Sequence, residues 1–351
     1  MITSVICFED RTDNNALIKE QKILSILNSS AVYVDRLVVL DINDSEGFIK
    51  ELDYESNALF ILNKEKATFN VSKVLIDKGL NFDADGFYVD NRLIALVPAN
   101  LESYSELCIK KLSQFYGFNV GRLVFKVLGK TKPQILAVTN EISAKYPLVF
   151  FNVESFALDN KVCLFYSDKS TKMDVDKATK DFIIAFKNNI YAEEDVSIAK
   201  RLYDLLKLRR LTISTAESMT GGRIASKIVE IDGASDVFYE GMVTYNTLAK
   251  ERRLDVSHNT VVENTVVSSK VAYEMAAGIL KNAEVAISIT GYAGSSVSAS
   301  DDDGLCFIGI GLFDKIEVYQ FNFNGTRREN IETAANMALY LALKTILDTD
   351  F

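Results

Sequence analysis

The stretch LTISTAESMTGGRIAS, residues 211–226, contains an apolar, β-branched run, then an acid and a serine, then two glycines that open a helical run. This order predicts a strand, a turn and a helix. In an α/β sheet, the turn after a parallel strand lies at the carboxyl edge of the sheet, where ligands bind. We therefore expect Ser218, which falls in this turn, to lie at such an edge.

The alternation of strand-like and helix-like segments extends through the rest of the chain. In the first half, apolar runs such as ALFIL (58–62) and RLIALV (92–97) alternate with helical segments such as KEQKILSIL (19–27). In the second half, a helical stripe over 191–210 precedes the opening stretch. Strands separated by helices predict sheets that are mixed or mostly parallel.

The length of the chain and the alternation of strand-like and helix-like segments together predict the domain organisation. A chain of 351 residues exceeds what one hydrophobic core usually serves. We predict an α/β fold with two domains, at 1–121 and 191–351, each a mixed or mostly parallel sheet flanked by helices. A small α+β segment at 122–190 connects them.

Composition narrows the classes of function. The net charge is −9 and basic residues form no stripe, which disfavours direct nucleic-acid binding. The apolar runs are too short to span a bilayer, so we predict a cytoplasmic protein without a membrane segment. The cysteines show no metal-binding or disulfide spacing, and the one histidine, His258, lies in a polar segment. We predict no metal site and no cofactor.

The turn after the predicted strand has two interpretations. Ser218 could act as a nucleophile beside free amides near Gly221 and Gly222, which can hold a phosphate or an oxyanion. Alternatively, Ser218 or Thr220 only caps the helix, and the glycines permit a tight turn. The stretch alone leaves both open.

Residues that could assist such a serine occur in VTYNTLAK, residues 243–250. A serine without a histidine needs another base, and a lysine with a lowered pKa, or a tyrosine coupled to it, fills that role. Lys250 and Tyr245 are the candidates. The alternative is that Tyr245 belongs to the core and Lys250 is a solvated charge.

Two further segments could hold a phosphate. In SITGYAG (288–294), small residues permit close approach of the backbone and Thr290 could donate a hydrogen bond; a plain loop is the alternative. In GTRRE (325–329), Arg327 or Arg328 could bind a phosphate or simply lie on the surface.

These motifs, in the order AESMTGG, GMVTYNTLAK, TVVSSKVAYEMAAG, ISITGYAG, GLCFIGIGL and GTRR, resemble the C-terminal domain of the CinA family over about residues 195–350. That domain is a nicotinamide-nucleotide amidase, which converts nicotinamide mononucleotide to nicotinate mononucleotide and ammonia. The resemblance implies a serine nucleophile assisted by lysine and tyrosine, at Ser218, Lys250 and Tyr245. It also implies a substrate pocket, and the residues placed there are Glu217, Thr220, Gly221, Gly222, Thr290, Gly291, Gly294 and Arg327.

The sequence also departs from the family's pattern. The loop after Gly294 reads SSVSASDDDG, without the expected proline and glycines, and Ile331 stands where the family tends to carry a further arginine. The first half resembles the family's molybdopterin-binding-like domain only in element order, and its phosphate loop is replaced by NKEKATFN, residues 63–70. Because the glycines that would bring backbone amides to a phosphate are missing, we expect the first half to be a degenerate scaffold or dimerisation domain. We expect it to be inactive and to lack the family's ADP-ribose pyrophosphatase activity.

The alternative to an amidase is a catalytically silent nucleotide-binding or partner-binding protein linked to competence or the DNA-damage response. The altered loop and the degenerate first half favour that alternative, whereas the complete set of serine, lysine and tyrosine favours the amidase. A general amidase for another pyridine or pterin amide is a third hypothesis. The family resemblance also implies a homodimer.

Overall fold

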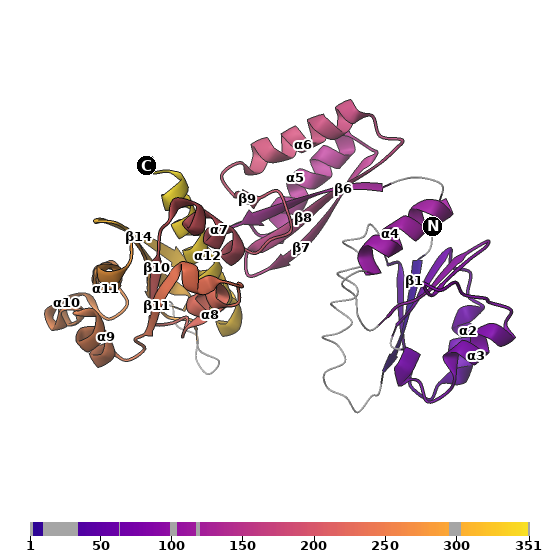
Figure 1. The fold of residues 1–351 in the computed structure, drawn as a ribbon, viewed down its shortest axis with the longest axis horizontal. Helices are drawn as coiled ribbons and strands as arrows, with labels where there is room; N and C mark the ends of the chain where they lie inside the picture. The colour runs from indigo at the N-terminus through magenta and orange to yellow at the C-terminus, as the bar shows by residue number, and fades with distance from the viewer. Residues whose placement is uncertain are drawn as a thin grey trace. The chain divides into compact units, whose positions relative to one another are not determined.

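The structure is a computed structural model that describes residues 3–9, 34–62, 64–98, 104–116, 120–294 and 303–349 (Figure 1). The contacts between residues divide the chain into two compact units. One unit comprises 1–123, 141–152 and 163–180, and the other comprises 124–140, 153–162 and 181–351.

The N-terminal sheet has the strand order β2-β1-β3-β5-β4, and all neighbours are parallel except β4 and β5. Alternate residues of β1 point to opposite faces, so Val5 packs toward α4 and Phe8 packs toward α2 and α3. The helices thus cover both faces of the sheet (Figure 1). The elements are β1 (Thr3–Glu9), β2 (Arg36–Asp41), α2 (Ser45–Leu52), β3 (Ala58–Leu62), α3 (Val71–Asp77), β4 (Phe87–Val89), β5 (Leu93–Leu96) and α4 (Tyr104–Tyr116).

The middle sheet has the order β7-β8-β6-β9, and two helices, α5 and α6, cover one of its faces (Figure 1). Phe125 of β6 packs against Phe182 of α6, with ring centroids 4.9 Å apart. The elements are β6 (Val120–Leu128), α5 (Lys132–Lys145), β7 (Val149–Phe156), β8 (Asp159–Ser167), α6 (Lys172–Phe186) and β9 (Ile190–Ala192).

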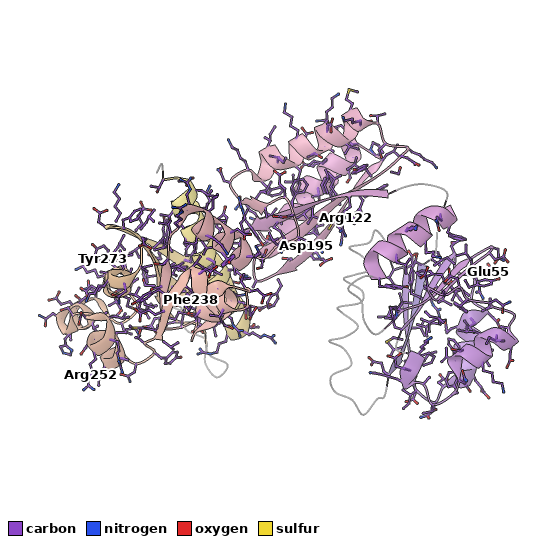
Figure 2. The ribbon with its side chains drawn as sticks, in the orientation of Figure 1. Glu55, Arg122, Asp195, Phe238, Arg252 and Tyr273 are labelled. Carbon is purple, nitrogen blue, oxygen red and sulfur yellow. The ribbon has the colours of Figure 1, made fainter. Side chains whose placement is uncertain are left out.

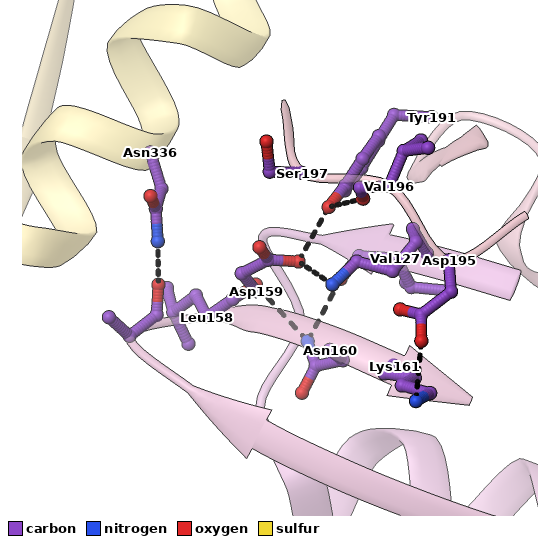
Figure 3. A network of polar contacts seen from close by, with 12 residues as sticks. Val127, Leu158, Asp159, Asn160, Lys161, Tyr191, Asp195, Val196, Ser197 and Asn336 are labelled. Atoms are coloured by element: carbon purple, nitrogen blue, oxygen red, sulfur yellow. Dashed lines mark hydrogen bonds and ion pairs between the residues drawn. The ribbon is translucent and has the colours of Figure 1, made fainter. Parts of the chain in front are cut away.

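A polar network ties the turn between β7 and β8 to the last helix, α12 (Arg327–Leu347) (Figure 3). Asn336 of α12 donates to the carbonyl of Ala157, and the buried Asn160 amide donates to the carbonyls of Val127, Lys130 and Leu158. Because buried polar groups are costly unless bonded, these contacts fix the turn against α12.

The C-terminal sheet, which carries the opening stretch, has the order β11-β10-β12-β13-β14. β10 is parallel to both of its neighbours, whereas the β12–β13 and β13–β14 pairs are antiparallel. The strands are β10 (Ile213–Glu217), β11 (Phe238–Val243), β12 (Val285–Gly291), β13 (Leu305–Leu312) and β14 (Lys315–Asn322).

Helices cover both faces of this sheet. Ile213 packs with α7, α8 and α12, whereas Ala216 packs with α9 and α11. Arg252 of α9 and Tyr273 of α11 project outward from the second layer (Figure 2). The remaining helices are α7 (Ile198–Arg209), α8 (Arg223–Val229), α9 (Thr247–Leu254), α10 (His258–Asn264) and α11 (Ser269–Ile279).

The predicted fold class, α/β with sheets flanked by helices, is confirmed. The helix predicted over 191–210 is too long at its start: Tyr191 and Ala192 belong to β9, and Ser197 caps a helix that begins at Ile198. Because the apolar spacing of that helix dominates the segment, the short strand before it was predicted as part of the helix. The helix predicted at 19–27 and most of the loop at 295–304 lie outside the described residues.

All four cysteines are buried. Within the described ranges, no three His, Cys, Asp or Glu side chains are grouped so as to hold a metal ion. None of the helices in those same ranges combines the length and apolarity needed to cross a membrane.

Candidate active site

Ser218 follows β10 directly, at the carboxyl edge of the C-terminal sheet. Its amide donates to the carbonyl of Ile289 in β12 at 3.0 Å, and its own carbonyl accepts from the amide of Gly221 at 3.0 Å. These bonds hold the turn against the neighbouring strand. The serine is 8% exposed, so its hydroxyl lies in a mostly buried position.

Lys250 approaches this serine from the first turns of α9. The Asn246 side chain caps that helix by accepting from the amide of Leu248. The lysine side chain turns into the protein and is only 1% exposed, and its Nζ lies 2.9 Å from Ser218 Oγ. The alternative of a solvated Lys250 is therefore wrong.

Lys250 Nζ has two further contacts, with the carbonyl oxygens of Thr244 at 2.6 Å and Tyr245 at 3.3 Å. No carboxylate among the described residues forms an ion pair with it within 4.0 Å. Burial penalises the ammonium form and lowers the pKa of Lys250 to about 8.

The ammonium and the neutral amine of Lys250 can form different hydrogen bonds. An ammonium donates to all three oxygens, whereas a neutral amine has only two N–H groups and one lone pair. Carbonyl oxygens only accept, so the neutral form donates to Thr244 and Tyr245 and turns its lone pair toward the Ser218 hydroxyl. This is the geometry that a general base requires.

The side chain of Tyr245 is not brought to this pair. It is 62% exposed, so it is not a core residue, and its hydroxyl accepts a hydrogen bond from Arg327 at 3.2 Å. In the described part of the chain, Tyr245 contacts Lys250 through its backbone carbonyl and not through its phenol. The sequence predicted that Tyr245 lies beside Lys250. It did not indicate that the backbone carbonyl, rather than the phenol, faces the lysine.

Glu217, the last residue of β10, places its carboxylate at the start of α8. Its side chain is 1% exposed, and its carboxylate accepts from the amides of Gly222, Ile224 and Ala225 at 2.8–3.0 Å and from the hydroxyl of Thr220 at 2.8 Å. These are the amides that a helix leaves without intrahelical partners. The structure thus assigns the capping role to Glu217, with Thr220 as a donor to it.

The expectation of free amides near Gly221 and Gly222 is wrong for this reason. The amide of Gly222 donates to Glu217, and that of Gly221 donates to the Ser218 carbonyl. Within the described chain, the amides of Met219 and Thr220 donate to no protein acceptor. Met219 directly follows the serine, which is the position that supplies an oxyanion donor in serine hydrolases with a strand–turn–helix nucleophile.

Replacing Glu217 with glutamine is expected to destabilise the C-terminal domain by about 2–4 kcal/mol, because an amide nitrogen would face backbone donors. Denaturant unfolding followed by circular dichroism measures the change. Glu230→Gln, at the exposed end of the same helix, is the matched control and should unfold like the wild type. Loss of activity at unchanged stability would show instead that Glu217 acts on a ligand.

The strand β12 supplies small residues rather than a phosphate donor. The hydroxyl of Thr290, expected to donate to a ligand, donates to the carbonyl of Val266 at 2.9 Å and is 1% exposed. At Gly291, a Cβ atom would lie 2.4 Å from Met219 Sδ and 2.5 Å from Cys306 Cβ. Glycine is needed there because β12 packs closely against the residue after Ser218.

Residues 292–294, which directly follow β12, are held by the start of α12. Gly294 has a φ of +101°, which favours glycine, and its carbonyl accepts from Arg327 at 2.8 Å. Asn330, 2% exposed, donates to the carbonyl of Ala293 and accepts from the amide of Gly325. Arg327 is exposed and bridges this loop to Tyr245, an arrangement that leaves guanidinium N–H groups for an anion.

Comparison with known proteins assigns the family. The sequence profile of the CinA C-terminal domain matches residues 195–346. One relative is a competence-damage inducible protein, by its name, of Caldicellulosiruptor saccharolyticus. It is 28% identical over 299 residues, which cover 82% of this chain and 72% of that one. A "CinA-like protein" of Fusobacterium nucleatum is 38% identical over 178 residues, covering 50% of this chain and 44% of that one.

A solved structure of a competence-damaged protein (CinA) superfamily protein from Enterobacter cloacae is 30% identical. The match covers 45% of this chain and 97% of that chain, with a TM-score of 0.41. The profile match contains Ser218, Lys250 and Arg327, and the similarity to the Caldicellulosiruptor protein extends beyond the C-terminal domain. The chain belongs to the CinA family.

Proposed function

We propose that the C-terminal domain is an amidohydrolase that converts nicotinamide mononucleotide to nicotinate mononucleotide and ammonia. The observation that carries this proposal is the buried Lys250 amine, 2.9 Å from Ser218 Oγ and held by two carbonyl oxygens. A serine and a lysine in this arrangement can perform acyl transfer without a histidine. Membership of the CinA family supports the choice of substrate.

In the first half of the reaction, neutral Lys250 takes the Ser218 proton while Oγ attacks the amide carbon. The amides of Met219 and Thr220 are the proposed donors to the oxyanion. The ammonium of Lys250 then protonates the departing nitrogen, and ammonia leaves. The product of this half is an ester between Ser218 and the nicotinoyl group.

The nucleotide part of the substrate is proposed to lie along the sheet edge toward α12. Arg327 is exposed there, and the space beside Gly221 and Gly294 leaves the backbone accessible at those two positions. A guanidinium is suited to a phosphate. Thr290 shapes this edge through its bond to Val266, and Glu217 and Thr220 shape it by fixing the turn.

The experiment that tests the proposal uses the purified full chain with nicotinamide mononucleotide, nicotinamide riboside and nicotinamide, each in excess. Ammonia is quantified, and the pyridine products are separated by chromatography. The proposal predicts equal amounts of ammonia and nicotinate mononucleotide, with the nucleotide as the preferred substrate. Ammonia from nicotinamide alone would indicate a general amidase. No ammonia from any amide would favour the catalytically silent, partner-binding alternative.

The proposal predicts that activity rises with pH. Because the active lysine is the neutral amine and its pKa is about 8, kcat/KM should increase roughly tenfold per pH unit below that value and level off above it. Initial rates of ammonia release between pH 6 and 9.5 measure the profile. A rate that is flat, or that falls as pH rises through 8, would rule out Lys250 as the base.

Tyr245→Phe separates the roles of the tyrosine. Its hydroxyl contacts Arg327 and its carbonyl contacts Lys250, so removing only the hydroxyl should alter substrate binding more than chemistry. We expect kcat within about threefold of wild type and a KM raised by roughly three- to tenfold, since one hydrogen bond contributes about 1 kcal/mol. A kcat as low as that of a Lys250 variant would place the phenol in proton transfer.

A further inference from the structure

The nucleophile has a threonine beside it on each neighbouring strand. Glu217 is in register with Val243 of β11 and with Ile289 of β12. The ladder continues by one residue, because the Thr244 amide donates to the Glu217 carbonyl and the Ser218 amide donates to the Ile289 carbonyl. Thr244, Ser218 and Thr290 therefore form one row, with neighbouring strands about 4.8 Å apart.

The three side chains of this row share a face of the sheet. The residues two positions earlier are Met242, Ala216 and Ser288. The first two pack in the core beneath α9 and α11, and the Ser288 hydroxyl donates to the Ala272 carbonyl of α11. Because side chains alternate along a strand, the row faces the same helices. This is the face from which Lys250 reaches Ser218.

The three hydroxyls differ in their partners. Ser218 is paired with Lys250, and Thr290 donates to Val266. The Thr244 hydroxyl is buried, in a residue 2% exposed, and no group in the described chain bonds to it. A buried hydroxyl without a partner is unfavourable, so such a group in a site points to a small polar ligand.

We propose that the Thr244 hydroxyl holds the water that cleaves the acyl ester on Ser218, an inference that rests on the proposed amidase function. The Thr244 hydroxyl has almost no accessible surface, so the pyridine ring cannot contact it and its partner would be a single water. Lys250 Nζ, 2.6 Å from the Thr244 carbonyl and 2.9 Å from Ser218 Oγ, contacts the two residues between which that water would lie.

The step balances without another reactant. Neutral Lys250 takes one proton from the water as its oxygen attacks the ester carbon. The bond between that carbon and Ser218 Oγ then breaks, and the Lys250 ammonium returns the proton to Oγ. The acid that forms loses its proton to solvent and leaves as the carboxylate. Thr244 is a positioning residue in this scheme, since it orients the water and exchanges no proton.

Thr244→Val tests the proposal, because valine keeps the shape and removes the hydroxyl. Ammonia leaves in the acylation step, so a slow second step gives a burst of about one ammonia per enzyme followed by a slow phase. We expect this burst with nicotinamide mononucleotide, and a steady rate roughly 10- to 100-fold below wild type. Thr244→Ser should restore the wild-type rate, and Thr244→Ala should show the same burst if valine impairs folding.

The matched control is Ser214→Ala. Ser214 lies in β10, is fully buried, and its hydroxyl also lacks a partner in the described chain, but it is four residues before the nucleophile. Its loss should leave both phases unchanged. Wild-type kinetics in Thr244→Val and Thr244→Ala, or an equal fall in the fast and slow phases, would overturn the role of Thr244 while leaving the amidase intact. A wild-type protein that releases no ammonia would overturn both.

Discussion

Replacing Lys250 with methionine should reduce kcat for ammonia release by about 10²- to 10⁴-fold, the range expected when a general base is lost. Among the described residues, Lys250 is the one side chain that forms a hydrogen bond with the Ser218 hydroxyl, so no second base is in place. The single histidine, His258, is exposed and pairs with Glu251. The residual rate should lose the rise with pH.

The same substitution should leave the protein as stable as the wild type or more stable at pH 7. The unfolded chain protonates this lysine up to about pH 10.5, and the folded chain only up to about 8. Between these values the unfolded state binds more protons, so the free energy of unfolding rises with pH. Below pH 8 the full cost of the buried ammonium is present, about 3 kcal/mol at most, offset in part by its hydrogen bonds.

Thermal unfolding at pH 7 and initial rates measure the two effects together. Lys281→Met is the matched control, because Lys281 is an exposed lysine that pairs with Asp255. It should change neither quantity. Lys250→Arg should be inactive and less stable, since arginine stays charged and is larger. A Lys250→Met protein that keeps wild-type activity would contradict the assignment of the base.

Removing the nucleophile should have the largest effect. Ser218→Ala is expected to lower kcat by about 10⁴- to 10⁶-fold, because without Oγ only binding and the oxyanion donors remain. The turn is held by backbone bonds to Ile289 and Gly221, so the fold and substrate affinity should persist. Ammonia release and isothermal titration with nicotinamide mononucleotide measure the two quantities.

Ser226→Ala supplies the control for this substitution. Ser226 lies in α8, eight positions along the chain, and its hydroxyl donates to the Glu230 carboxylate at 3.4 Å. Its activity should equal that of the wild type. If Ser218→Ala failed to bind the nucleotide, its loss of activity would be ascribed to binding and the nucleophile assignment would lose its support.

The sequence was sufficient to predict the elements that position the site. The β-branched run before Ser218 and the glycines after it specify the strand, turn and helix, and the structure has β10 and α8 there. Lys250 was also predicted, because a serine without histidine chemistry needs an amine. These features are local in sequence or follow from the chemistry required.

Side-chain direction was harder to predict. Glu217 caps α8 although it lies five residues before the N-cap, because the turn folds back over β10. The Tyr245 phenol turns to Arg327, which is 82 positions away along the chain. Thr244 lies beside Ser218 only through the register of β11. An acid before the serine and a hydroxyl before Tyr245 were the available signals, and neither specifies its partner.

The most direct test of a Ser218–Lys250 amidase is to find the acyl group on Ser218. The protein is mixed with nicotinamide mononucleotide, quenched in acid within the first turnover, digested, and analysed by mass spectrometry. The account predicts a nicotinoyl-nucleotide adduct on the Ser218 peptide, more abundant in Thr244→Val and absent from Ser218→Ala. An adduct on any other residue, or ammonia release by Ser218→Ala at the wild-type rate, would contradict it.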